Sequence, residues 1–523
     1  MTAESGCPGM ADAPNVLIFQ TDQQRGDVIP PNPPCRTPNV QRIIDEGVLF
    51  TSHYTQTAHC CPARASFMTG HYPSQHGVWN NILTNTRLSD GLSEGMRCFS
   101  EDLDEAGWDL AYTGKWHVSA VENPRDRGWR ELETITAPAG GVHEQRLQRI
   151  RVAVAEEDPD RPRRDGEILR PGWVNRHIYA ASPDGGPRGY EKLLDYRVTR
   201  EAIEELPRLA GGDAPWMLYC GPVGPHDPFT IPEKFATMYD PDEVELPESF
   251  RDTLEDKPRI YQRMRHQYWG QMSEREVRES IAHYWGYCTM LDAMFGELVD
   301  ALEATGELDN TVVIFTSDHG DYCGEHGLYC KGVPAFRGAY HVPLAIRWPG
   351  GAEAGTVCDE FTTHADMANT FRDLAGCPEP NSEMPGRSIV PLLEGRVPDD
   401  WRDAMHTQFN GVEVYYTQRA VFTKDWKYVY NAYDYDEMYD LRNDPHEMQN
   451  LAAPCRNPIG HDNVPEKRSP GEFQPWPELP GHLNEARKDM LGRMWRFAAE
   501  RDDTIFNPYF TVALTPYGPG AFE

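Results

Sequence analysis

Long apolar runs are missing from this chain. No stretch approaches the roughly 18 consecutive apolar residues of a membrane span, and residues 1–14 lack the basic start and apolar core of an export signal. Cysteine is also sparse: 12 cysteines in 523 residues do not make a disulfide scaffold. We therefore expect no membrane partner, reduced cysteines and a cytoplasmic location.

Positive charge is scarce as well. The chain has 50 Lys and Arg against 82 Asp and Glu, a formal net charge of −32. Such a field repels the phosphate backbone of nucleic acids and anionic lipid headgroups, so we expect neither as a partner. An anionic substrate must be attracted by a local positive pocket against the field of the whole protein. Internal repeats and low-complexity segments are also absent, which excludes repeat architectures.

Four apolar runs have the pattern of buried strands, and each is followed at once by polar residues of catalytic type. The runs are residues 16–19, 109–113, 216–220 and 311–315. The polar residues that follow them include Asp22, Gln23, Lys115, His117, His226, Asp318 and His319. Uninterrupted apolar strands that alternate with helices favour a largely parallel sheet covered on both faces. Because ligands bind at the carboxyl ends of such strands, we expect these residues to share one active site.

Two helices between these strands are well marked. Thr37 and Pro38 open one that stops at Gly47. Ser273 and Glu276 form a capping-box pattern at the start of a long helix that ends at Gly306. The apolar stripe of that helix predicts packing against the sheet.

The composition changes twice along the chain. Between residues 121 and 195 it is rich in Pro, Gly, Arg and Asp, which indicates a surface insertion and a candidate part of the substrate rim. After about residue 390, short aromatic runs at 419–423, 426–430 and 437–441 predict an antiparallel meander. We therefore predict an α/β fold with a large, mostly parallel central sheet flanked by helices, in a catalytic domain at 14–390. A smaller C-terminal α+β subdomain with an antiparallel sheet follows at 391–523.

The most informative motif is the stretch Cys60-Cys61-Pro62-Ala63-Arg64, continued to Gly70. It predicts a short helix with Pro62 at its first position and Gly70 at its end. A thiol at the start of this helix faces unpaired N–H groups and the positive end of the helix dipole. Arg64 adds a planar fork of donors for a tetrahedral oxyanion. The alternative is a buried cysteine pair that serves packing alone.

This motif resembles the signature of the type I, formylglycine-dependent sulfatases, which belong to the alkaline-phosphatase-like superfamily. The resemblance extends from about residue 15 to residue 452 and includes Asp318-His319-Gly320 and the stretch from Tyr439 to Glu447. It implies that Cys60, and not Cys61, is oxidised to formylglycine by a maturation enzyme. One hydroxyl of the hydrated aldehyde then attacks sulfur, and the other allows sulfate to be eliminated.

The resemblance also assigns the remaining site residues. The implied metal ligands, beside modified Cys60, are Asp22, Gln23, Asp318 and His319. The implied sulfate-binding lysines are Lys115 and Lys331, and Arg64 holds the geometry of the nucleophile and the metal site. His117 is implied to assist the nucleophile and later to accept a proton, while His226, with Lys331, is implied to protonate the leaving oxygen.

Two positions depart from the commonest pattern of the family. Gln23 stands where a second Asp is usual, and His319 stands where Asn is often found. The Gln and His pair resembles the choline-sulfatase and phosphonate-monoester-hydrolase branches. Calcium is the expected ion, with manganese or magnesium as alternatives because a nitrogen ligand suits softer ions.

The sequence therefore predicts a sulfuric ester hydrolase that releases inorganic sulfate from a small-molecule or saccharide sulfate ester. A phosphonate monoester or phosphodiester hydrolase with the same site is the alternative, and a silent binding protein with unmodified Cys60 is a third reading. The leaving group and the oligomeric state have no signal in the sequence.

Overall fold

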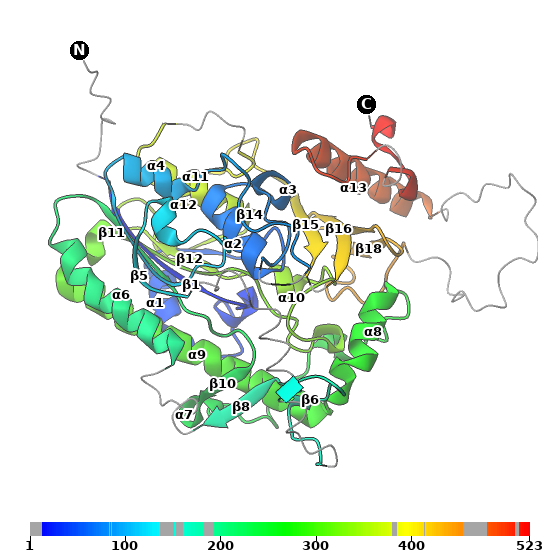
Figure 1. Ribbon diagram of the computed structural model, residues 1–523. Coiled ribbons are helices and arrows are strands. Elements are labelled where there is room, and N and C mark those ends of the chain that lie inside the picture. The colour runs from blue at the N-terminus through cyan, green and yellow to red at the C-terminus, as the bar shows by residue number, and fades with distance from the viewer. Residues whose placement is uncertain are drawn as a thin grey trace, which may run out of the picture.

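The computed structural model describes residues 13–82, 84, 86–135, 151–152, 161–182, 193–378, 384–412, 414–452, 479–507 and 512–522, and all structural statements concern these residues. An eight-stranded sheet forms the centre (Figure 1). Its strand order is β13 (Thr356–Cys358), β2 (Val48–Phe50), β12 (Leu344–Arg347), β11 (Thr311–Ser317), β1 (Asn15–Thr21), β9 (Trp216–Gly221), β4 (Asp109–Lys115) and β5 (Arg130–Ile135).

The sheet is mostly parallel, as the sequence predicts. β1 pairs in parallel with β11 and β9, and β9 with β4. Only β12 runs against its neighbours β11 and β2 in the described sheet. Every residue of β1, β9 and β11 is buried, which explains their continuous apolar sequence.

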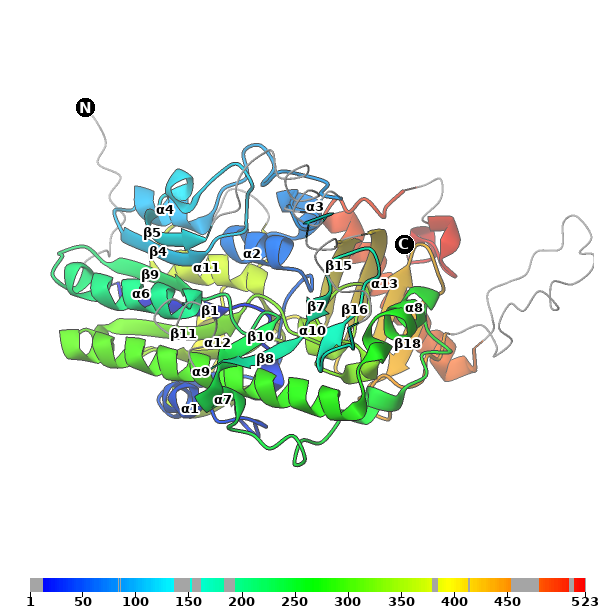
Figure 2. The same ribbon diagram turned by 60° about the horizontal axis from the view of Figure 1, so that its bottom comes forward.

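Helices cover both faces of the sheet. Leu17 and Phe19 of β1 belong to one apolar core, with residues of α1 (Pro38–Asp45), α6 (Leu194–Ala210) and α9 (Glu274–Thr305). Val16 and Ile18 point into the other, with residues of α2 (Cys60–Thr69), α4 (Phe99–Glu105) and α11 (His364–Leu374). Figure 2 shows the two helix layers, with α4 and α2 on one side and α1 and α9 on the other.

The long helix α9 has the termini that the sequence predicts. Ser273 Oγ accepts a hydrogen bond from the Glu276 N–H at 3.3 Å, and the Glu276 carboxylate accepts one from the Ser273 N–H at 2.8 Å. Gly306 ends the helix in a left-handed conformation, with φ of 83°.

A second, antiparallel sheet contains β15 (Met405–Gly411), β16 (Tyr415–Phe422), β17 (Trp426–Asn431) and β18 (Glu437–Asp440), in that order. One face, including Val421 and Tyr428, packs on α13 (Gly481–Glu500). The other face, including Ala420 and Val429, joins the main core. The antiparallel C-terminal sheet is thus confirmed, while the boundary at residue 390 stays a prediction.

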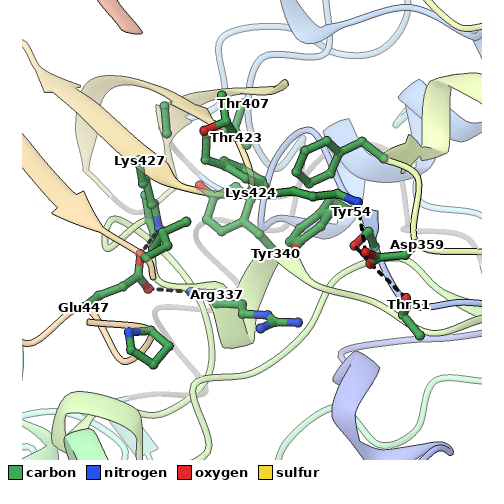
Figure 3. A pocket seen from close by; sticks show the side chains of 17 residues that line it. Thr51, Tyr54, Arg337, Tyr340, Asp359, Thr407, Thr423, Lys424, Lys427 and Glu447 are labelled. Atoms are coloured by element: carbon green, nitrogen blue, oxygen red, sulfur yellow. Dashed lines mark hydrogen bonds and ion pairs between the residues drawn. The ribbon is translucent and has the colours of Figure 1, made fainter. Parts of the chain in front are cut away.

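A cavity of about 370 Å³ lies where the antiparallel sheet meets the main body (Figure 3). Lys424 Nζ lies 2.9 Å from Asp359 Oδ2, and Lys427 pairs with Glu447. The backbone N–H of Arg337, at the start of α10 (Arg337–Tyr340), also donates to the Glu447 carboxylate at 3.1 Å. The contacts of Lys424 with Asp359 and of Arg337 with Glu447 link the C-terminal part to the main body along the cavity wall.

The predicted insertion at 121–195 is only partly described. β5 lies within this range but pairs with β4, so residues 130–135 belong to the main sheet and not to an insertion. β6 (Glu167–Ile168), β7 (Arg176–His177) and β8 (Tyr179–Ser182) follow, and β8 pairs with β10 (Phe229–Pro232). Residues 136–150, 153–160 and 183–192 lie outside the described part. No helix in the described ranges combines the length and apolar character needed to cross a bilayer.

Candidate active site

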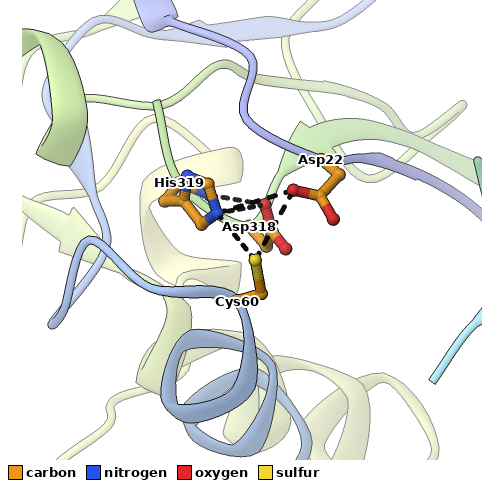
Figure 4. A group of neighbouring side chains, drawn as sticks. All are labelled: Asp22, Cys60, Asp318 and His319. Atoms are coloured by element: carbon orange, nitrogen blue, oxygen red, sulfur yellow. Dashed lines mark hydrogen bonds and ion pairs between the residues drawn. The ribbon is translucent and has the colours of Figure 1, made fainter. Parts of the chain in front are cut away.

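The carboxyl ends of β1 and β11 bring the predicted ligands together. Thr21 and Ser317 are the last paired residues of these neighbouring parallel strands, so Asp22 and Asp318 emerge side by side. Their carboxylates, with Cys60 Sγ and His319, offer ligand atoms that all lie within 4.8 Å of one another (Figure 4). Fully buried strands at the centre of the sheet therefore fix the spacing of the cluster.

Helix α2 presents Cys60 to this cluster. The helix begins at Cys60 with His59 as an extended N-cap, and Gly70 ends it with φ of 75°. Pro62 is thus the third helical residue and not the first, which is permitted because N–H groups of the first turn have no partner within the helix. The Asn81 side-chain oxygen accepts a hydrogen bond from the Cys61 N–H at 3.2 Å.

The Cys60 sulfur lies among cations and a carboxylate. Sγ is 3.1 Å from Lys331 Nζ, 3.2 Å from His319 Nε2 and 3.8 Å from Asp22 Oδ1. Burial alone would raise the pKa of this thiol, but Lys115 and Lys331 hold the pKa well below its usual range. The position therefore favours an anionic or strongly polar group.

Arg64 is fully buried and committed to protein partners. Its Nε donates to Asp318 Oδ2 at 2.8 Å, and its Nη1 donates to the Lys115 carbonyl at 2.9 Å and to the Tyr219 hydroxyl at 3.1 Å. Arg64 therefore does not offer the free donor fork that the sequence predicts, because within the described residues Nε and Nη1 are already hydrogen-bonded and only Nη2 is not. The guanidinium instead joins α2 to the ends of three strands.

Asp318 and His319 have fixed orientations. The Asp318 Oδ1 accepts from the backbone N–H groups of His319 at 2.8 Å and Gln23 at 3.1 Å. His319 Nδ1 lies 2.9 Å from the Gly320 carbonyl, which can only accept, so Nδ1 carries the proton. The lone pair on Nε2 then faces Cys60 and Lys331, as a metal ligand requires.

Lys115 reaches Asp22 from the end of β4. The preceding Gly114 has φ of 100°, and a Cβ there would lie 2.0 Å from the Gly221 carbonyl oxygen, so only glycine fits. Lys115 pairs with Asp22. Burial alone would raise the pKa of Asp22, but Lys115, His226 and Lys331 hold it below its usual range.

The two predicted catalytic histidines have different surroundings. His226 is partly exposed, and its Nδ1 lies 2.7 Å from the Asp227 carbonyl. Burial and Lys331 oppose its charge, but Asp22, Cys60 and Asp227 raise its pKa. His117 has φ of 57°, and neither of its ring nitrogens has a hydrogen-bond partner in the part of the chain that the structure describes. Burial and then Lys115 lower its pKa. Cys60 raises the pKa of both imidazoles, which opposes the effect of burial.

The predicted donor set fits a divalent cation. It combines two carboxylates, an amide oxygen and an imidazole nitrogen around the Cys60 position. Lys331 Nζ contacts Gln23 Oε1 at 2.8 Å, His319 Nε2 at 3.0 Å and the Cys60 sulfur, so the acceptors on this side already face a positive charge. Oxygen-rich sets suit calcium or magnesium, and the imidazole also suits manganese.

Sequence reasoning missed three residues around this cluster. Asp227 and Asp321 both accept hydrogen bonds from Gln23, and Arg176 pairs with Asp227. The two aspartates directly follow the recognised His226 and Gly320, a signal that could have found them. Arg176 lies in a range without clear periodicity, and nothing in the sequence marked it.

Comparisons with known proteins agree with this geometry. The family model described as Sulfatase matches residues 14–377, and the model described as N-sulphoglucosamine sulphohydrolase, C-terminal, matches residues 324–458. A choline-sulfatase of Rhizobium meliloti (strain 1021) is 29% identical over 467 residues, covering 85% of this chain and 84% of the relative. An N-acetylglucosamine-6-O-sulfatase of Bacteroides thetaiotaomicron is 27% identical, covering 84% of this chain and 82% of the relative.

Among solved structures, the phosphonate monoester hydrolase of Agrobacterium radiobacter is similar, with a TM-score of 0.68 and 27% identity. The match covers 84% of this chain and 91% of that one. The fold and the site together define a hydrolase of the alkaline-phosphatase-like superfamily. More specifically, the chain belongs to the sulfatase family and is a sulfuric ester hydrolase.

Proposed function

We propose that this enzyme hydrolyses a sulfate monoester through a formylglycine derived from Cys60, with one bound divalent cation, and releases inorganic sulfate. The observation that carries the proposal is the difference between the two adjacent cysteines. Cys60 Sγ lies at the helix start among Asp22, His319 and Lys331. Cys61 packs in the apolar core, where burial raises the pKa of its thiol. Of these two cysteines, only Cys60 therefore lies beside polar and charged groups that can assist a nucleophile.

The cation would be held by Asp22, Gln23, Asp318, His319 and the modified Cys60, with calcium as the expected ion. When bound, it supplies a positive charge that polarises a sulfate oxygen and acidifies the nucleophile. Cys60 Sγ marks the place of the formylglycine hydroxyls. Arg64 keeps Asp318 in position, which preserves the ligand geometry.

The protein's own cations and imidazoles would handle the substrate. Lys115 and Lys331 would neutralise the sulfate oxygens, because Lys331 Nζ lies 3.1 Å from the Cys60 sulfur and the charge of Lys115 lowers the pKa of the same thiol. His226 is partly exposed and its pKa is raised, which suits a donor of a proton to the leaving oxygen. His117, whose pKa is lowered, suits the acceptance of a proton from the Cys60 position.

The names of the relatives support a small-molecule or saccharide sulfate ester as the substrate class. One is named for choline sulfate and another for a 6-O-sulfated N-acetylglucosamine. The proposal also requires a maturation enzyme that oxidises Cys60. Phosphonate monoester hydrolysis is the second candidate, favoured by the presence of Gln23 with His319 and by the structural similarity to the enzyme from Agrobacterium radiobacter.

A mass measurement and two variants test the nucleophile. In active protein, the peptide with Cys60 should contain a carbonyl in place of the thiol, while Cys61 stays unmodified. Cys60→Ala should lower sulfate release at least about 1000-fold, because covalent catalysis is lost. Cys61→Ala, the matched control, should keep activity within a few-fold. Full activity of Cys60→Ala, or of protein with only an unmodified thiol at residue 60, would disprove the mechanism.

A further inference from the structure

The Gln23 side chain is held by two carboxylates that no step of the proposed function uses. Its Nε2 donates to Asp321 Oδ2 at 2.6 Å and to Asp227 Oδ1 at 3.2 Å. Its Oε1 accepts from Lys331 Nζ at 2.8 Å. Gln23, Asp227 and Asp321 are all buried.

These contacts allow one orientation of the amide. An amide has two N–H donors on its nitrogen and only acceptors on its oxygen. In the opposite orientation, Oε1 would face the oxygens of Asp227 and Asp321, and Nε2 would face the Lys331 ammonium. Acceptors would then face acceptors at the two aspartates, and donors would face donors at Lys331, so the flipped orientation is strongly disfavoured. The oxygen, which is the only metal-ligating atom of the amide, is therefore directed toward Lys331, beside Cys60 and His319.

The two carboxylates are themselves fixed by other segments. Asp321 Oδ1 accepts from the backbone N–H groups of Cys323 at 2.6 Å and Cys330 at 3.0 Å. Asp227 Oδ2 accepts from Arg176 Nε at 3.0 Å, and the Cys330 thiol donates to Asp227 Oδ1 at 3.1 Å. Each carboxylate therefore uses one oxygen on Gln23 and fixes its orientation through other bonds.

Arg176 brings a third segment to this arrangement. It lies on β7, within the range that the sequence marks as an insertion, and its guanidinium stacks 5.6 Å from the Trp269 ring. Its ion pair with Asp227 offsets the repulsion between Asp227 and Asp321, which share the Gln23 amide.

We propose that Asp321 and Asp227 are positioning residues that set the divalent-metal affinity of the site by fixing the Gln23 amide oxygen, and that Arg176 supports Asp227 in this role. This inference rests on the metal site of the proposed function. It also explains why an amide occupies position 23: a carboxylate there would meet two further carboxylates.

Metal affinity of the full chain tests the inference without any substrate. The protein is freed of metal with a chelator and titrated with calcium, and in parallel with manganese, by calorimetry. Asp321→Asn keeps an oxygen for the Cys323 and Cys330 N–H groups but turns an NH₂ toward Gln23 Nε2. We expect a 10- to 100-fold loss of affinity, roughly the range for groups that orient metal ligands. Asp227→Asn should act in the same direction.

Asp292→Asn is the matched control. Asp292 is also buried, and it accepts from the backbone N–H groups of Asn39 and Val40, so its bonds hold α1 to α9 and not the Gln23 amide. The control should lower stability without changing metal affinity. Equal losses in Asp292→Asn and Asp321→Asn, or an affinity of folded Asp321→Asn within about twofold of the parent, would overturn the inference.

A double-mutant cycle distinguishes a loss of orientation of the residue 23 side chain from nonspecific destabilisation of the site. In Gln23→Glu with Asp321→Asn, the asparagine NH₂ donates to one glutamate oxygen, which restores a donor–acceptor pair with the roles exchanged. We expect the double variant to bind metal about tenfold or more tightly than the product of the single effects predicts. If the two effects simply multiply, the proposal is contradicted.

The titration of the parent protein distinguishes failure of the inference from failure of the proposed function. If the parent protein itself binds no divalent metal, the metal site of the proposed function fails together with the inference. If the parent binds metal and the variants bind it equally well, the inference alone fails.

Discussion

Arg64 joins three parts of the candidate site through its own hydrogen bonds. Its side chain has no exposure, and it bonds Asp318, the Lys115 carbonyl and Tyr219 through separate N–H groups. A lysine has one charged nitrogen and cannot make these three contacts in the same geometry. The planar guanidinium is therefore needed where α2 meets the strand ends.

We predict that Arg64→Lys lowers the free energy of unfolding by about 2 kcal/mol, since about two buried hydrogen bonds are lost. Catalytic activity should fall at least about 100-fold because Asp318 loses its orientation. Urea unfolding and sulfate release measure the two effects. Tyr219→Phe, which removes one Arg64 partner, should cost less in both, and an Arg64→Lys variant with normal stability and activity would refute this role.

The sequence predicted the residues that stand directly after buried strands better than those around them. Asp22 and Asp318 were recognisable because each ends an apolar run. Asp227 and Asp321 do not end an apolar run, and their positions directly after His226 and Gly320 were the only mark they had in the sequence. They meet the site through hydrogen bonds to Gln23, which is separated from them by 204 and 298 positions. Contacts over such distances need the fold.

At the scale of elements, the long parallel strands and the aromatic strands β16, β17 and β18 were predictable, while β2, β12 and β15 were not. β1, β9 and β11 have six or seven buried residues each, so apolar composition alone marks them. β2 has three residues and β12 has four, and β12 runs against its neighbours. Runs this short are indistinguishable from buried loops by composition. β15 was also missed, because its polar Thr407, Gln408 and Asn410 interrupt the apolar pattern.

The turn between β17 and β18 contains a buried carboxylate that should make stability depend on pH. Asp436 accepts from the Tyr428 hydroxyl and from the Asn431 N–H at 3.1 Å, and burial raises its pKa to about 7. The folded state therefore binds a proton more tightly than the unfolded state does. The contribution is fully present below about pH 4 and is lost as pH rises toward 7.

We predict that Asp436→Asn flattens the pH dependence of stability between pH 4 and 8, because an amide resembles the protonated acid. Roughly three pKa units set a ceiling of about 4 kcal/mol for the difference. Melting temperatures of the parent and the variant across this range give the measurement. Parallel curves would show that Asp436 titrates alike in both states.

At the scale of the whole molecule, the net charge opposes the charge of the substrate. The chain carries −32, yet Lys115, Lys331 and Arg64 gather at the strand ends. Asp22 and Asp318 offset Lys115 and Arg64 through direct ion pairs. The attraction for an anion that these ion pairs leave uncompensated therefore comes from Lys331 and, in the proposed function, from the divalent cation, while Lys115 adds a donor to the sulfate oxygens at short range.

This balance predicts the choice between esters. A sulfate monoester carries one negative charge, and a phosphate monoester carries nearly two near neutral pH. Gln23 in place of a carboxylate makes the site more positive, which would admit either anion, but the field of the whole protein disfavours the more charged one. We therefore expect a higher kcat/KM for a sulfate ester than for the phosphate ester with the same leaving group. The phosphonate ester carries one charge, like the sulfate ester, and we expect it to be the poorer substrate because the chain belongs to the sulfatase family. The three esters are compared side by side with fully modified, metal-loaded enzyme. A preference for the phosphonate of more than about tenfold, which corresponds to about 1.4 kcal/mol in transition-state binding, would favour phosphonate monoester hydrolysis as the activity.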